Sequence, residues 1–109
     1  FTQETAMKTI IVTALLATGV AGSALAAEPL DIAKKANCLA CHDVNAKKVG
    51  PAWKDVAKKY AGDAGAQARL MTAVKKGGKG NWGAIPMPPN PTIKDDDLRN
   101  LVQFILALK

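Results

Sequence analysis

The feature that most constrains this chain is the pentapeptide Cys38-Leu39-Ala40-Cys41-His42, which contains both cysteines and the only histidine. Two thiols separated by two residues and followed at once by an imidazole match the C-x-x-C-H attachment signature of c-type haem. At this spacing both thiols reach the vinyl groups of one porphyrin, and the imidazole points at the iron as its proximal ligand. The motif therefore predicts one haem c, attached by two thioethers at Cys38 and Cys41, with His42 bound to the iron.

Three other interpretations of the same residues are weaker. A structural zinc site needs four ligands, and the chain offers only two cysteines and one histidine. A thioredoxin-like dithiol belongs to a βαβ pattern, and the sequence contains none. A plain disulfide is possible in an exported protein, but it would leave the adjacent histidine unexplained and would constrain the unfolded chain little.

The N-terminal residues are typical of a targeting segment. Met7-Lys8 is followed by the 12-residue apolar run TIIVTALLATGV and by an A-x-A site at residues 24–26. The run is too short to cross a bilayer core of about 30 Å as a stable helix, and an uncleaved anchor would normally lack the A-x-A site. We predict that residues 1–26 are upstream residues plus a cleaved secretory signal peptide, and that the protein is periplasmic, where haem attachment takes place.

The remaining residues, 27–109, are predicted to form one small domain. Residues 1–26 contain one lysine and one glutamate, so the formal charge of the mature chain stays at +6. A domain of this size buries a modest core and often depends on a disulfide, a metal or a cofactor. Nucleic-acid binding is a poor interpretation of the positive charge, because the protein is predicted to be exported and carries no recognition motif.

Hydrophobic spacing predicts an all-α fold without strands. Helical patterns cover residues 29–42, 51–61, 65–76 and 94–109, and the first begins with proline and an acid in its first turn. The last is the clearest, with three acids at its N-terminal end and an apolar stripe along it. Four glycines and four prolines between residues 77 and 91 exclude regular structure there and predict one long ordered loop.

Because the chain has a single histidine, ligation of the iron by two histidines of one chain is excluded. The sixth position is then occupied by methionine, occupied by a weaker ligand such as lysine or asparagine, or vacant. Outside the targeting segment the methionines are Met71 and Met87. Met71 lies in a helical stripe and is predicted to belong to the core. Met87 lies in IPMPPN, where prolines fix φ and hold a thioether on a stiff loop. We therefore predict His42/Met87 ligation, which raises the reduction potential relative to stronger donors.

CLACH, VGP, NWGAIPMPPN and the C-terminal amphipathic helix together resemble the small bacterial class I cytochromes c of the c-551/c-552 group, over residues 31–109. The resemblance implies a class I cytochrome c fold, with about four helices around one covalently bound haem. It also implies that the Pro51 carbonyl accepts a hydrogen bond from His42, that Trp82 donates to a haem propionate, and that Asn90 hydrogen-bonds near the Met87 sulfur. At Ala73 some relatives have a propionate-binding arginine, so this chain departs from the pattern there.

The function expected from these features is that of a soluble periplasmic electron carrier, not an enzyme, that cycles haem iron between Fe(III) and Fe(II). The main alternative is a haem enzyme or gas-binding sensor, which needs an open sixth position on the iron; a subunit dedicated to one complex is a third. Expected partners are periplasmic redox proteins of a respiratory chain: a terminal oxidase, a nitrite reductase or a peroxidase. The chain is expected to be a monomer without stable membrane insertion, and its lysine pairs would steer it toward acidic partners.

Overall fold

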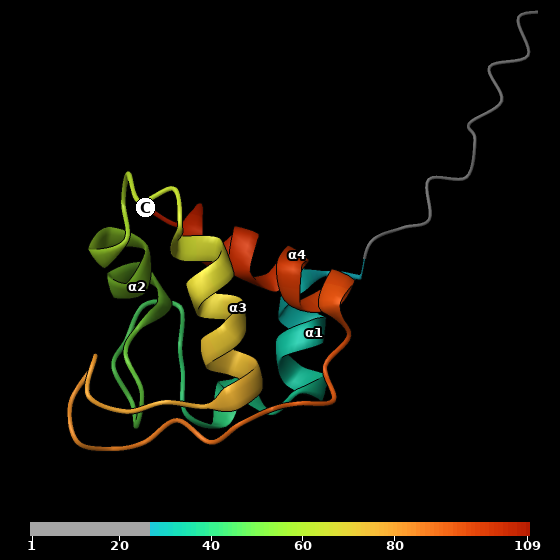
Figure 1. Ribbon diagram of the computed structural model, residues 1–109, viewed down its shortest axis with the longest axis horizontal. Coiled ribbons are helices and arrows are strands. Elements are labelled where there is room, and N and C mark those ends of the chain that lie inside the picture. The colour runs from blue at the N-terminus through green and yellow to red at the C-terminus, as the bar shows by residue number, and fades with distance from the viewer. Residues whose placement is uncertain (1–26) are drawn as a thin grey trace, which may run out of the picture.

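The structure, a computed structural model, describes residues 27–109, so the signal peptide predicted for residues 1–26 lies outside the described residues. The described part contains the helices α1 (Pro29–Lys35), α2 (Trp53–Lys59), α3 (Ala66–Lys76) and α4 (Asp95–Leu106), with a short 3-10 helix, η1 (Cys38–Ala40) (Figure 1). Its β-structure is a single isolated bridge between Gly78 and Met87. The predicted all-α class is confirmed. Among these residues no helix has the length and apolarity that a membrane span requires.

The first helix is shorter than predicted. The pattern over residues 29–42 was expected to be one helix, but α1 ends at Lys35 and Asn37 adopts a left-handed conformation at φ 62°. Asparagine tolerates this conformation better than most residues, so the chain can turn there and restart as η1. The backbone N–H groups of Cys41 and His42 then both donate to the Cys38 carbonyl oxygen, at 3.2 and 2.9 Å. The attachment motif therefore begins on the short 3-10 helix η1 and is not a continuation of α1.

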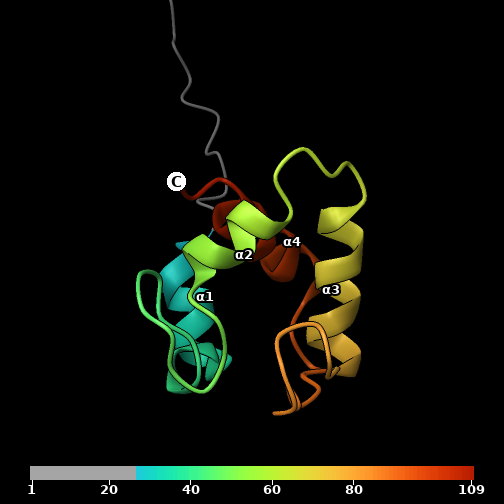
Figure 2. The same cartoon turned by 90° about the vertical axis from the view of Figure 1, so that its left-hand side faces the viewer.

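Helix α4 is the centre of the packing, because it contacts α1, α2 and α3 (Figure 2). Its apolar stripe is buried as the spacing predicted: Leu98, Leu101 and Val102 are at most 2% exposed. No polar or charged residue is buried among the described residues, so the core is held by apolar contacts alone. The central cluster consists of residues from α1, α2 and α4: Ile32, Ala33, Trp53, Val56, Leu101 and Ile105.

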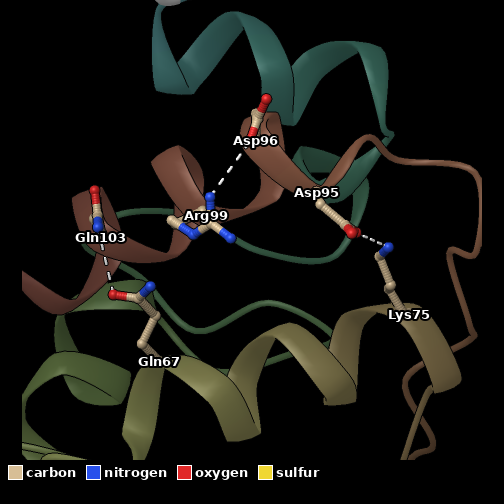
Figure 3. Close-up of polar contacts among 6 residues, drawn as sticks. All are labelled: Gln67, Lys75, Asp95, Asp96, Arg99 and Gln103. Carbon is tan, nitrogen blue, oxygen red and sulfur yellow. Dashed lines mark hydrogen bonds and ion pairs between the residues drawn. The ribbon is translucent and has the colours of Figure 1, made fainter.

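Polar contacts join the exposed sides of α3 and α4 (Figure 3). Lys75, at the end of α3, forms an ion pair with Asp95 at the start of α4, and Gln103 donates to Gln67 at 3.4 Å. Lys75 and Asp95 are both solvent-accessible, so this pair contributes little to stability. The two helices are held together mainly by the apolar stripe beneath these contacts.

The 77–91 segment is a long loop, as predicted, and it is fixed by backbone hydrogen bonds. Gly78 and Met87 exchange two N–H···O bonds, at 3.1 and 2.7 Å, and Asn90 N–H donates to the Val74 carbonyl oxygen at 2.8 Å. In Figure 2 this orange loop lies beside α3, while the green loop of residues 43–52 lies beside α1. The two loops therefore approach the middle of the molecule from opposite sides.

Candidate functional site

A single cleft brings together five of the seven residues singled out in the sequence, and Cys38 and Asn90 are not part of its lining. It holds about 1050 Å³, including the part that is open to solvent, and its lining is mainly apolar. His42 and Met87 both line it, although they come from different loops. The rest of the lining comes from α2, α3, α4 and the two loops, and includes Cys41, Pro51, Val56, Leu70, Val74, Trp82, Ile85 and Ile105.

The orientation of the His42 ring is fixed by its neighbours. Nδ1 lies 2.8 Å from the carbonyl oxygen of Pro51, which can only accept, so Nδ1 carries the proton and Nε2 is left as the nitrogen available to a metal. The ring stacks against Trp53, with centroids 5.9 Å apart and planes 27° apart. On another side the Gly50 backbone lies so close that an added Cβ would be 2.6 Å from His42 Cε1. The imidazole therefore has little freedom to rotate.

Both cysteines are free and half-buried. Cys41 lines the cleft, and Cys38 packs against the central core cluster at the start of η1. Burial raises the pKa of the Cys38 thiol. A backbone hydrogen bond lowers this pKa in part, and the nearby Cys41 raises it further. A redox-active dithiol has a lowered pKa, so the Cys38 thiol does not have that character.

Met87 is half-buried and is held in the cleft by the backbone on both sides of it. Besides the paired hydrogen bonds with Gly78, its carbonyl oxygen lies against Gly77, where a Cβ would be only 2.6 Å away. Gly77 also has φ 74°, a conformation that L side chains rarely adopt. Glycine at position 77 is thus required for the chain to return over α3 and bring Met87 to the cleft.

The structure places the remaining predicted residues as follows. Trp82 lines the cleft and is 40% exposed. The Asn90 amide donates to the Ala36 carbonyl oxygen at 3.1 Å, which ties the loop to the end of α1. Its expected role beside the Met87 sulfur stays a prediction, and so does the bond from Trp82 to a propionate. The Ala73 methyl group lines the cleft, at the position where the resemblance implies a propionate-binding arginine in some relatives.

Two functional positions were missed in the sequence, Gly50 and Gly77. Each is needed because a neighbouring segment approaches its backbone closely, the His42 ring at Gly50 and the Met87 carbonyl oxygen at Gly77. The VGP and GG patterns signal turns, and neither pattern reveals what lies against them. This information becomes available only when the loops are placed in space.

The residues present suit a haem better than a bare metal ion. Within residues 27–109, no group of three or more His, Cys, Asp or Glu side chains could hold a metal ion. By contrast, a wide apolar cleft with one oriented imidazole, one thioether and a neighbouring thiol matches the donor set of an iron porphyrin. The close approach of Gly50 to the His42 ring shows that the imidazole is held ready on the wall of this cleft.

Comparisons with known proteins agree with this description. The family model described as Cytochrome c matches residues 22–109. Cytochrome c-551 of Pseudomonas aeruginosa is 47% identical, covering 94% of this chain and all of that protein; cytochrome c-551 of Allochromatium vinosum is 54% identical, covering 87% and 99%. A crystal structure of wild-type Nitrosomonas europaea cytochrome c552 superimposes with a TM-score of 0.71 and 51% identity, covering 73% of this chain and 99% of that one.

These matches confirm the class I cytochrome c fold that the motifs implied. They cover the helices, the attachment turn and the loop that carries Met87, so the likeness includes the whole cleft and not only its pentapeptide. The chain belongs to the cytochrome c family, in the group of the small bacterial cytochromes c-551 and c-552, which are electron carriers with covalently bound haem c.

Proposed function

We propose that the protein is a soluble periplasmic electron carrier with one haem c, bound by thioethers to Cys38 and Cys41 and ligated by His42 and Met87. The observation that carries the proposal is the oriented imidazole: Nδ1 bonded to Pro51 leaves Nε2 for the iron, and Met87 lines the same cleft. When bound, the haem supplies an iron that gains and loses one electron. The protein supplies the ligands, their orientation and the exclusion of water.

The fixed geometry of the ligands suits electron transfer. The His42 ring is held by Pro51, Trp53 and Gly50, and Met87 is held by the backbone of Gly77 and Gly78. Side chains that are already ordered do not have to rearrange when the charge on the iron changes, so each electron transfer is fast. The apolar lining also disfavours the extra positive charge of the oxidised iron and thereby raises the reduction potential.

We assign supporting roles to Trp82 and Asn90. The exposed position of Trp82 on the cleft supports donation from its indole N–H to a haem propionate. Asn90 ties the loop to α1 and α3 through Ala36 and Val74, and we propose that it also lies near the Met87 sulfur in the haem-bound protein. These contacts would tune the iron and would not take part in the transfer itself.

The proposed partners are periplasmic redox proteins of a respiratory chain: a terminal oxidase, a nitrite reductase or a peroxidase. The predicted signal peptide in residues 1–26 and the haem attachment motif support a periplasmic location. The net charge of +6 supports electrostatic steering toward acidic partners by a monomer that binds transiently. Reduction rates with a candidate partner should then fall as ionic strength rises, and rates that do not change with salt would exclude steering.

An absorption spectrum of the purified protein, oxidised and reduced, together with a pyridine haemochrome, tests the proposal. We expect a low-spin haem c, a Met–Fe(III) charge-transfer band in the oxidised protein and slow carbon monoxide binding by the reduced one. Rapid carbon monoxide binding at neutral pH would instead favour the haem enzyme or gas-binding sensor with an open sixth position.

Two variants test which methionine is the sixth ligand of the iron. Met87→Ala should abolish the charge-transfer band, because the sulfur ligand is removed. Met71→Ala, on α3, is the matched control and should keep the band, although it loses the same side chain. A band that survives in Met87→Ala would show that the sixth ligand is a different residue.

A further inference from the structure

Lys59, the last residue of α2, reaches across to the 77–91 loop. Its Nζ donates to the Asn81 carbonyl oxygen at 2.8 Å and lies 4.5 Å from the centroid of the Trp82 ring. Both contacts come from one ammonium group, and the second is within the range of a cation–π interaction. In Figure 1 the far end of this orange loop lies below α2.

The part of the loop that Lys59 contacts has few other attachments. Residues 80–84, here called the loop tip, are closed on themselves by a bond from Gly80 N–H to the Gly83 carbonyl oxygen at 3.0 Å. The pairing of Gly78 with Met87 holds the base of the loop, not the tip. Among the described residues, Lys59 is the one helix residue that makes polar contacts with the loop tip.

The same contacts place positive charge at one end of the cleft. Haem carries two propionate carboxylates, and a carboxylate in apolar surroundings is costly unless a cation or a hydrogen-bond donor is near it. The cleft lining offers only a methyl group at Ala73, whereas Lys79 and Trp82 line it on the loop side. Lys59, over the Trp82 ring, adds a second ammonium group to that side.

We propose that Lys59 is a positioning residue that fastens the loop tip to α2, holds the Trp82 indole at the cleft and adds positive charge beside it. The inference rests on the proposed function, since it assumes that the propionates lie at the Trp82 end. Lys59 itself is not part of the cleft lining, so it acts through Asn81 and Trp82. A positive charge here favours the reduced iron, because the reduced site carries one positive charge fewer.

The holoprotein variants Lys59→Met and Lys58→Met provide a matched test. Both lose one exposed lysine from the last turn of α2, but Lys58 makes none of the contacts with the loop tip described above. Hydrogen exchange followed by NMR reports the fastening. We expect the Trp82 indole N–H and the Gly80 amide to exchange about twofold to fivefold faster in Lys59→Met, which is the size of one lost cation–π contact at an exposed site. Equal exchange rates in the two variants would overturn the proposal.

Reduction potentials report the effect of the positive charge of Lys59. Replacing a residue with a merely structural role would leave the potential unchanged. At a fixed applied potential, Lys59→Met should lower the ratio of reduced to oxidised protein about threefold, equivalent to roughly 30 mV for one electron. Lys59→Arg keeps both the charge and the donor, so it should restore the wild-type ratio. If the ratio of reduced to oxidised protein decreased equally in Lys58→Met and Lys59→Met, the placement of the charge beside the cleft would be overturned.

The outcome also separates this inference from the proposed function. A wild-type protein without a reversible one-electron potential or without the Met–Fe(III) band would refute the proposed function. A wild-type protein with both properties, whose Lys59→Met and Lys58→Met variants behave alike, would leave the electron carrier intact and refute only the role of Lys59.

Discussion

Replacing Gly50 by alanine tests whether the backbone at this position fixes the His42 ring. The added Cβ would lie 2.6 Å from Cε1 and 2.9 Å from Nδ1 of that ring. Carbon atoms in contact are ordinarily about 3.5–4.0 Å apart, so the ring or the backbone must move by about 1 Å. Nδ1 of the same ring also donates to the Pro51 carbonyl oxygen, at 2.8 Å. Because one rigid ring makes both contacts, relief of the clash disturbs the hydrogen bond.

The expected loss in the free energy of unfolding follows from the clash and from the disturbed hydrogen bond. Forcing an extra methyl group into a packed site costs about 1–3 kcal/mol, and a typical intramolecular hydrogen bond contributes about 0.5–1.5 kcal/mol. We therefore expect Gly50→Ala to lower the free energy of unfolding of the holoprotein by about 2–4 kcal/mol. For a domain of this size, each kcal/mol corresponds to a change in Tm of about 4–8 °C, so Tm should fall by about 10 °C or more.

Thermal and denaturant unfolding of the holoprotein, followed by circular dichroism, measures this effect. Gly65→Ala is the control, because a Cβ at the start of α3 would be no closer than 3.5 Å to its nearest neighbour, the Asp63 carboxylate. A Gly50→Ala protein whose free energy of unfolding lies within about 0.5 kcal/mol of the Gly65→Ala value would refute the reasoning. It would mean that the ring adapts to the methyl group without cost.

Three further predictions concern the fold. Leu98→Ala, at a fully buried position of α4, should lower the free energy of unfolding by about 2–5 kcal/mol; a smaller loss in denaturant titrations would contradict its place in the core. Lys75→Met should cost less than about 1 kcal/mol, since its pair with Asp95 is solvent-accessible, and a double-mutant cycle with Asp95→Asn measures the coupling. The backbone N–H groups of Asn45 and Ala46 donate to the Asp43 carboxylate and lower its pKa. The contribution of Asp43 to the free energy of unfolding is therefore fully present above the unfolded pKa of about 3.9 and is lost as pH falls through the lower folded pKa. Asp43→Asn should flatten the pH dependence of unfolding in that acidic range, and an unchanged slope would argue against these bonds.

The elements that could be predicted from the sequence are those with strong periodicity. Helix α4 has acids in its first turn and a regular apolar stripe, and the structure confirms both. The first helix was predicted too long, because its apolar residues and the attachment motif are adjacent and share a helical spacing. What ends α1 is the backbone conformation of Asn37, a residue that helices also tolerate, so composition alone does not mark the boundary.

The candidate site was predictable where residue type determines chemistry. His42 is the only imidazole in the chain, and Met87 stands alone on a proline-rich loop, so both could be named as candidate ligands, and the structure places both on the cleft. Gly50, Gly77 and Lys59 could not, because their roles depend on what lies next to them after folding. A lysine among many becomes distinctive only when its ammonium group is found over an indole ring.

The way in which the loop is held explains how a segment without regular structure could carry the proposed iron ligand. Fixing the backbone of one residue costs about 1–2 kcal/mol, so an unrestrained loop of this length would hold a weak sulfur ligand poorly. Prolines on both sides of Met87 reduce the freedom that must be lost, since their φ angles are already fixed. The bridge to Gly78 fixes the segment at its base, and Asn90 fixes it again three residues beyond the methionine. The sulfur is therefore presented by a backbone that is fixed on both sides, and this supports the proposal that the methionine of the loop, and not the one on α3, binds the iron.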